Sequence, residues 1–348
     1  MESARRMQRA LTKVGTDSDD QPPSSAEAGG ERSDVESDAS GSDDDVVNQE
    51  GQQGVGTGEA TEGARKNAIR LLDVASMSVE GFQGHANEDR YVVASNERFH
   101  LFAVMDGHGG SWAGDFLVDE LFKTIEEVYD DGFDHTELSK ALEELDRRFC
   151  AMATRKMDTS GACLLAVLLY VDPNTDTPQK IVLNIGDCRA IAREAPKSAS
   201  SGKAKGKTAT TGAANAVALS EDHCAGNVKE RMRALRSGAF IQNRRIAGVL
   251  EPFRTIGDID MKGPDMKNWV IPSPEIRQSE LLVGRTILVI ATDGVWSVLN
   301  NNRTMALVAK EFGAHGSRPS AEAAAQAIVK EAREFGSSDD VTVIVVSV

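Results

Sequence analysis

The chain has 348 residues, of which 40% are hydrophobic and 27% are charged, proportions typical of a globular protein with one large domain or two small ones. Its formal net charge of −15 argues against nucleic acid as the main partner, because phosphate-backbone contacts require Lys and Arg. The four cysteines are widely spaced and form no C-x-x-C pair, which indicates separate thiols in a reducing compartment.

The N-terminal residues 1–66 are rich in Ser, Gly, Asp and Glu and show no hydrophobic periodicity. About a dozen acidic residues stand between Thr16 and Glu50 against a single arginine. Such a segment buries too little apolar surface to offset the entropy of ordering, so we predict a disordered acidic tail followed by a folded domain over residues 67–348. The chain shows no apolar run typical of a signal peptide or membrane span, and we expect a soluble protein of the cytoplasm or nucleus.

The folded region contains runs of β-branched residues bounded by Gly, Asp or Pro, which predict strands. In chain order these runs are FHLFAVMD (residues 99–106), ACLLAVLLYV (162–171), KIVLNIGD (180–187), RTILVIATD (285–293) and VTVIVVSV (341–348). A low-complexity segment over residues 195–216 interrupts them, and we predict a mobile loop there.

Two helices are predicted after the first run, because apolar residues recur there at helical spacing. These residues are Trp112, Phe116, Leu121, Ile125 and Val128 in the first helix, and Leu138, Leu142, Leu145, Phe149 and Met152 in the second. A third helix is predicted to begin near Ser320, a suitable N-cap residue. The order of elements predicts a sandwich of sheets with helices outside, and not a strictly alternating parallel sheet.

Acidic residues recur beside glycine at the ends of the predicted strands. They are Asp106-Gly107, Gly186-Asp187 and Asp293-Gly294 at strand ends, Asp339 before the last strand, and Glu88-Asp89 at the start of an early strand. A single Asp-Gly pair is a common turn signal. Five such carboxylate sites would repel one another if they converged without a cation. Because the group contains no paired Cys or His, its oxygen ligands indicate magnesium or manganese rather than zinc.

These motifs, in this order, resemble those of the metal-dependent protein phosphatase family (PPM, type 2C) over roughly residues 70–348. The matching segments are GHANEDRY, FAVMDGHGG, TSGACLLAVLL, NIGDCRAI, LSEDHCAGNVKERMRALRSGAFI, FRTIGDIDMKG, PSPEI, LVIATDGVWSVL and SSDDVTVIVV. The resemblance implies an α+β fold, a central antiparallel β-sandwich flanked by helices on both sides in four α-β-β-α layers. It also implies hydrolysis of phosphoserine and phosphothreonine esters in proteins at two Mg²⁺ or Mn²⁺ ions. We therefore expect phosphoprotein substrates as partners, neither nucleic acid nor membrane, and a monomeric chain.

The resemblance assigns metal-binding roles to the matched carboxylates. Asp106 is implied to bridge both ions, and the carbonyl of Gly107 to complete one shell. Asp293 and Asp339 are implied to hold one ion.

Further roles follow from the same resemblance. Glu88 and Asp89 are implied to serve the other ion, partly through water, and Asp187 resembles a ligand of a third, loosely held ion. His108 resembles the residue that protonates the leaving alkoxide, a step that helps because an alkoxide is a poor leaving group. A structural histidine in a turn would satisfy the same pattern at His108.

Two departures from the family pattern bear on the site. Where the family usually has a phosphate-binding Arg, four residues before the Glu of its first motif, this chain has Gly84 and loses a bidentate contact. Arg90 should point away from the site by strand alternation. The other conceivable substitutes are Arg70, Arg189, Arg254 and His85. Trp296 is followed by Ser297 instead of an acidic residue, so we expect the third ion to be held weakly or not at all.

Two functions fit this pattern. Retention of every core metal ligand favours an active phosphatase, because a scaffold does not need clustered carboxylates. The loss at Gly84 favours a pseudophosphatase, the same fold used as a binding or scaffolding module with weak or no activity.

Overall fold

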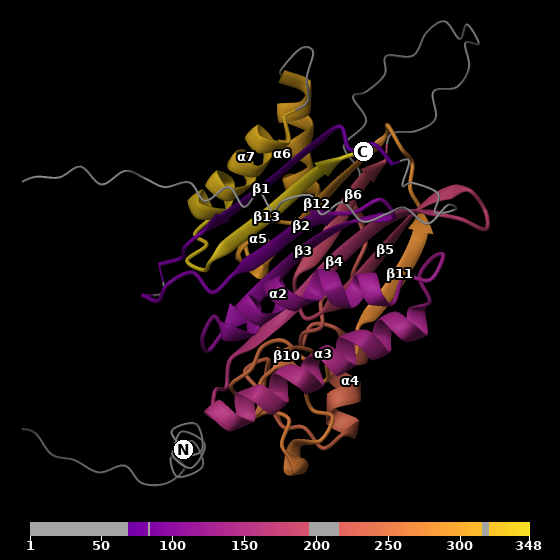
Figure 1. The fold of residues 1–348 in the computed structure, drawn as a ribbon. Coiled ribbons are helices and arrows are strands. Elements are labelled where there is room, and N and C mark those ends of the chain that lie inside the picture. The colour runs from indigo at the N-terminus through magenta and orange to yellow at the C-terminus, as the bar shows by residue number, and fades with distance from the viewer. Residues whose placement is uncertain (1–68, 83, 195–215, 315–319) are drawn as a thin grey trace, which may run out of the picture. The chain divides into compact units, whose positions relative to one another are not determined.

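The computed structural model describes residues 69–82, 84–194, 216–314 and 320–348 (Figure 1). The predicted acidic tail over residues 1–66 and residues 195–215 of the predicted loop lie outside the described residues. All four cysteines lie within them and are unpaired.

The first sheet brings together strands from both ends of the folded region. Its order is β1 (Asp73–Val79), β13 (Val341–Ser347), β12 (Thr286–Ala291), β6 (Arg189–Glu194) and β7 (Val217–Ala218). Every neighbouring pair is antiparallel. The end of β12 and the start of β13 therefore lie at the same edge of the sheet, where Asp293 and Asp339 are found.

The second sheet is built around β4, which is buried along most of its length. Its order is β11 (Glu275–Glu280), β5 (Thr177–Ile185), β4 (Gly161–Asp172), β3 (Phe99–His108) and β2 (Arg90–Ser95), and β10 (Ile256–Gly257) pairs with the start of β4. These pairs are antiparallel as well. The end of β3, the start of β2 and the end of β5 consequently share one edge.

Helices cover the outer face of each sheet, as Figure 1 shows. Helices α2 (Trp112–Glu127) and α3 (His135–Lys156) lie on the second sheet, and α6 (Asn301–Ala314) and α7 (Ala321–Glu334) lie on the first. In β3, Leu101 and Met105 pack toward α2 and α3, whereas Phe102 and Val104 pack toward the other sheet. A strand with two buried faces reads as a continuous apolar run, which explains the sequence signal. The predicted four-layer α+β fold is confirmed.

The predicted helical stripes face the core. In α3, Leu138, Leu142, Leu145 and Phe149 are fully buried, and Met152 is partly buried against the same cluster. The predicted start of the last helix is also confirmed, because the Ser320 side chain accepts a hydrogen bond of 3.1 Å from the amide of Ala323.

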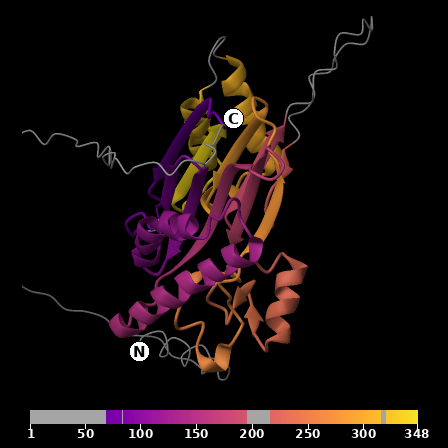
Figure 2. The ribbon, with the colours of Figure 1, turned by 45° about the vertical axis from the view of Figure 1, so that its right-hand side comes forward.

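Residues 221–271 form a small subdomain at the edge of the sandwich, which we call the α4 module. It contains α4 (Val228–Arg236), the hairpin strands β8 (Ile241–Gln242) and β9 (Arg245–Ile246), β10 and the 3₁₀ helix η1 (Pro264–Met266). Figure 2 shows α4 and its neighbouring short strands grouped below the sheets. The module has its own hydrophobic cluster, which includes Ala234, Ile246, Leu250, Phe253 and Val270.

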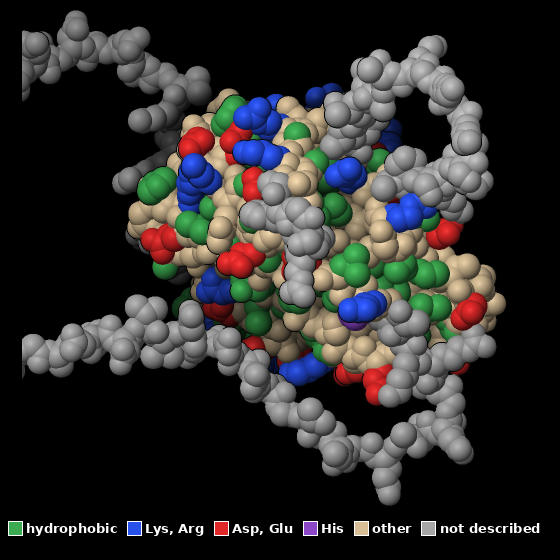
Figure 3. Space-filling view, turned by 90° about the horizontal axis from the view of Figure 1, so that it is seen from above, with side chains coloured by type: hydrophobic (Ala, Val, Ile, Leu, Met, Phe, Trp, Pro, Cys, Tyr) green, Lys and Arg blue, Asp and Glu red, His purple; other side chains and the backbone are tan. Residues whose placement is uncertain are grey.

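None of the helices in the described ranges combines the length and the apolar composition that crossing a membrane would take. On the face shown in Figure 3, the Lys and Arg side chains of the described residues are interspersed with Asp and Glu side chains. The expected location, the monomeric state and the exclusion of nucleic acid stay predictions.

Candidate active site

The last residues of β3 form the floor of the site. Asp106, Gly107 and His108 follow a buried stretch of the strand and line a cavity of about 410 Å³. A Cβ atom on Gly107 would lie 2.4 Å from the carbonyl oxygen of Glu88. Glycine is therefore required where the loop before β2 packs against the end of β3, and this close approach brings Glu88 to the cavity.

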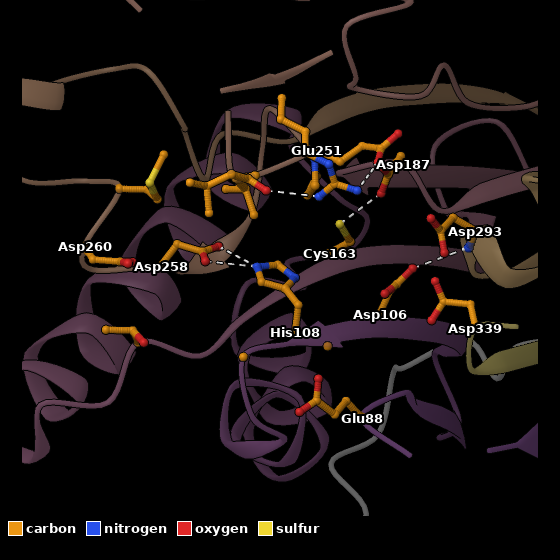
Figure 4. A pocket seen from close by; sticks show the side chains of 18 of the residues that line it. Glu88, Asp106, His108, Cys163, Asp187, Glu251, Asp258, Asp260, Asp293 and Asp339 are labelled. Carbon is orange, nitrogen blue, oxygen red and sulfur yellow. Dashed lines mark hydrogen bonds and ion pairs between the residues drawn. The ribbon is translucent and has the colours of Figure 1, made fainter. Parts of the chain in front are cut away.

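The first sheet adds two carboxylates to the same cavity. Asp293 is the first residue of the short helix α5 (Asp293–Trp296), and Asp339 lies just before β13. The backbone N–H of Asp293 donates to Oδ2 of Asp106 over 3.4 Å. Figure 4 shows Asp106, Asp293 and Asp339 side by side, although they come from different sheets. The edges of the two sheets thus bring together the residues implied to hold the ions.

Asp340, next in the chain, positions the Glu88 loop. Its carboxylate accepts hydrogen bonds from the backbone N–H groups of Gly81, at 2.6 Å, and Glu88, at 2.7 Å. The side chain is buried, so these bonds are shielded from water. Sequence reasoning missed this role, because the partners are about 250 residues away and no local pattern links them.

Asp89 lies beside the cavity without lining it. Its carboxylate accepts a hydrogen bond of 2.9 Å from the hydroxyl of Thr292. Burial raises the pKa of Asp89 to about 7, although hydrogen bonds from Thr342 and Thr292 oppose this shift. The predicted water-mediated role of Asp89 stays a prediction.

Asp187 enters the cavity from the loop after β5. Its carboxylate accepts a hydrogen bond of 3.2 Å from the thiol of Cys163 on β4. Burial raises the pKa of Asp187 to about 6, and the negative charges of Asp222 and Glu251 add to this rise. Asp187 therefore faces the cavity beside a thiol and close to another carboxylate, Glu251.

The carboxylates of the cavity repel one another. Desolvation raises the pKa of Asp106 well above its ordinary range, and the charge of Asp293 is the next largest cause. Desolvation also raises the pKa of Asp293, followed by the charges of Asp187 and Asp339. A site that crowds carboxylates in this way favours a bound cation.

The donor chemistry fits magnesium or manganese, because the cavity offers carboxylate and backbone carbonyl oxygens. In the described ranges, no three or more His, Cys, Asp or Glu side chains form a ready-made ligand cage. The fit therefore rests on the type of donors and on the repulsion that a cation would relieve.

His108 is held by a partner that the sequence did not reveal. Its Nε2–H donates to the carboxylate of Asp258, at 2.9 Å from Oδ1 and 3.0 Å from Oδ2. Burial alone would lower the pKa of His108, but the charge and hydrogen bond of Asp258 outweigh it and raise the pKa. Figure 4 shows the ring between Asp258 and Asp106. His108 therefore has a fixed partner at the end of β3, and its role as general acid stays a prediction.

Strand register explains why Asp258 reaches His108. Gly161 on β4 pairs with His108 on one side and with Gly257 on the other. A Cβ atom on Gly161 would lie 2.1 Å from Oδ2 of Asp258, so glycine leaves room for the carboxylate. Asp258 itself has a φ of 54°, in the left-handed region. The backbone here is shaped to point the carboxylate at the imidazole.

The family is settled by sequence comparison. Residues 73–341 match the family model described as protein phosphatase 2C. This match spans most of the chain, which therefore belongs to the protein phosphatase 2C family.

Curated relatives carry related names. Probable protein phosphatase 2C 14 from Arabidopsis thaliana is 30% identical over 217 residues, covering 61% of this chain and 42% of the relative. Probable protein phosphatase 2C 11 from the same plant is 28% identical over 264 residues, covering 74% and 61%. Protein phosphatase 1L from Bos taurus is 27% identical over 292 residues, covering 79% and 72%. The match thus spans 42% to 61% of the length of these two plant relatives.

Solved structures share the fold. A phosphatase from a pathogenic strain of Toxoplasma gondii has a TM-score of 0.64 and 20% identity, covering 80% of this chain and 94% of that chain. A sex determining protein of C. elegans has a TM-score of 0.63 and 22% identity, covering 80% and 65%. At such identities the likeness establishes the fold.

Proposed function

We propose that this chain is a metal-dependent protein phosphatase that hydrolyses phosphoserine and phosphothreonine monoesters. Membership of the protein phosphatase 2C family supports this proposal. The observation that carries it is the convergence of Asp106, Asp187, Asp293 and Asp339 in one cavity that also holds the His108–Asp258 pair. A scaffold has no need to bury carboxylates that repel one another.

The proposed ligands of the metal ions are Glu88, Asp89, Asp106, the carbonyl of Gly107, Asp187, Asp293 and Asp339. Bound Mg²⁺ or Mn²⁺ supplies an activated water and offsets charge on the phosphoryl oxygens. Ser297 in place of an acidic residue supports a weak third ion or none. The chain's own contribution is to hold these carboxylates at or next to the ends of strands from both sheets, so that Asp106, Asp187, Asp293 and Asp339 line one cavity.

His108 is the proposed general acid. The raised pKa favours the protonated ring, in which both nitrogens carry hydrogen. Asp258 holds Nε2–H, which leaves Nδ1–H to donate to the departing serine or threonine oxygen. Asp258 acts as a positioning residue, because it orients the ring and stabilises its charge.

The proposal is tested by incubating the protein with a phosphothreonine peptide and Mn²⁺, with and without a chelator. We expect phosphate release that stops on chelation and returns when Mn²⁺ or Mg²⁺ is restored in excess. Binding of the peptide without release of phosphate would support the pseudophosphatase instead. Full turnover in excess chelator, with no metal found by elemental analysis, would contradict metal dependence.

A further inference from the structure

The first motif supplies no guanidinium for the substrate phosphate. Gly84 has a φ of 83°, and a Cβ atom there would have no neighbour within 4 Å, so the position is open. His85 lines the cavity, but its Nδ1 bonds to the carbonyl of Ala86. Arg70 precedes β1 and is not among the residues that line the cavity.

The other arginines considered from the sequence are committed elsewhere. Arg189 makes a two-pronged contact with Asp222, at 2.9 and 2.5 Å. Arg254 makes the same kind of contact with Glu230, at 3.0 and 2.5 Å. Arg90 turns away toward α2, as its place in the strand predicted. None of the three lines the cavity.

Among the described residues that line the cavity, Arg245 is the only Lys or Arg. It is the first residue of β9 and follows the turn residues Asn243 and Arg244, whose φ angles of 51° and 66° define a tight hairpin turn. Ile246, the next residue, is fully buried and anchors the hairpin in the core of the α4 module. Arg245 is therefore a half-exposed side chain on a strand that is anchored by its buried neighbour.

The Arg245 guanidinium is paired with a carboxylate at the edge of the metal site. It donates to Oε2 of Glu251 over 2.7 Å and to the carbonyl of Val249 over 3.0 Å. Glu251, Arg245 and Asp187 all line the same cavity. Figure 4 shows Glu251 above Cys163 and beside Asp187, on the opposite side from Glu88.

We propose that Arg245 binds the phosphoryl group of the substrate in place of the missing guanidinium, and that Glu251 holds it until the substrate arrives. This proposal rests on the proposed phosphatase function. A guanidinium presents parallel N–H donors that match phosphate oxygens as well as they match a carboxylate. The phosphate thus takes over the contact that Glu251 provides in the free protein.

The exposure of the Arg245–Glu251 ion pair supports the replacement of Glu251 by a phosphate. The side chains of Arg245 and Glu251 are 46% and 41% exposed, whereas those of Arg254 and Glu230 are 16% and 6% exposed. An exposed ion pair contributes little to stability, so it can be broken when a dianionic phosphate arrives. The buried pair is far harder to break.

The test uses the full-length, magnesium-loaded protein and inorganic phosphate, whose binding is measured by calorimetry and by competitive inhibition of phosphothreonine-peptide hydrolysis. Arg245→Gln should weaken phosphate binding about tenfold or more, as expected for the loss of a charge-assisted hydrogen bond. Arg245→Lys should recover part of the loss, and Glu251→Gln should tighten binding. Arg244→Gln removes the same charge from the same turn, outside the cavity, and should change nothing.

The outcomes separate this proposal from the function on which it rests. Equal phosphate binding by Arg245→Gln and Arg244→Gln would overturn the role of Arg245. A rise in the peptide KM of Arg245→Gln with unchanged phosphate binding would show that Arg245 contacts the peptide and not its phosphoryl group. That result would also overturn the proposal. Phosphate binding that depends on Arg245 in a protein without turnover would refute the phosphatase function and leave the assignment of Arg245 standing.

Discussion

At the scale of single residues, Asp258 gives His108 a fixed hydrogen-bond partner inside an acidic cavity. The carboxylate both orients the ring and keeps its pKa above the value that burial alone would give. Without Asp258, the ring would be free to turn and would lose its proton more readily. The two residues should therefore act as a unit in catalysis.

A double-mutant cycle tests this unit. His108→Ala should slow phosphopeptide hydrolysis by about 10²–10⁴-fold, the range for a lost general acid. The loss should be smaller on p-nitrophenyl phosphate, whose phenolate leaves without a proton. Asp258→Asn should show the same substrate dependence, and the double variant should be no slower than His108→Ala. Fully additive losses would show that Asp258 does not act through His108. Equal losses of His108→Ala on both substrates would return His108 to a structural role.

The sequence could predict the carboxylates of the site but not their neighbours. Asp106, Asp187 and Asp293 follow apolar strands beside glycine, a pattern that is readable locally. Asp258 and His108 are 150 residues apart, and they meet only because β10 and β3 flank the start of β4. Arg245 escaped notice for the same reason, since its hairpin is placed by tertiary packing.

At the scale of elements, Glu230 fixes the α4 module that carries the hairpin. Its carboxylate accepts from Arg233 over 3.0 Å and from Arg254 over 2.5 and 3.0 Å. Arg254 and Arg233 also donate to backbone carbonyls of Ser273 and Phe253. This network joins α4 to the segment from Phe253 to Ser273, which leads back to the second sheet. It thereby holds the hairpin that carries Arg245 beside the cavity.

Glu230→Gln should lower the free energy of unfolding at pH 7 by about 2–4 kcal/mol, because it leaves two half-buried guanidinium groups without a counter-charge. Burial opposes ionisation of Glu230, but the hydrogen bond and charge of Arg254, joined by Arg233, lower its pKa below the ordinary 4.5. The wild type binds fewer protons when folded than when unfolded. This stabilisation is therefore complete above the ordinary pKa of 4.5 and is lost as the pH falls through the depressed pKa of the folded protein.

Urea unfolding at a series of pH values measures this effect. The difference between wild type and Glu230→Gln should shrink below about pH 4.5. Glu144→Gln, which breaks an exposed ion pair with Arg147, should cost little at any pH. A Glu230→Gln effect that does not vary with pH would show that the charge of Glu230 is not what stabilises the module.

The sequence predicted the large helices more readily than the α4 module. The buried stripe of α3 and the Ser320 cap of α7 are regular signals, and both are confirmed. In contrast, Val228, Met232 and Leu235 on α4 are exposed. The spacing of apolar residues in α4 therefore does not predict which face of the helix is buried. Its packing rests on the single buried Ala234 together with the Glu230 network.

At the scale of the whole molecule, the four layers explain why distant motifs converge. Both sheets are antiparallel, so the end of one strand and the start of its partner share an edge. The apolar runs predicted the strands and the layers, because strands buried on both faces leave continuous hydrophobic segments. The strand order was not readable from those runs, since it depends on pairings between the two ends of the domain.

We propose above all that carboxylates from both sheets hold the metal ions on which hydrolysis depends. The most direct test compares Mn²⁺ binding by calorimetry with phosphothreonine-peptide turnover, in wild type and in Asp106→Asn. We expect wild-type turnover to rise with Mn²⁺ occupancy. Asp106→Asn should bind Mn²⁺ more weakly and show no turnover at any Mn²⁺ concentration, because the carboxylate that lies between Asp293 and the end of β3 has lost its charge. Wild-type turnover by Asp106→Asn, or Mn²⁺ binding unchanged by the substitution, would contradict this account.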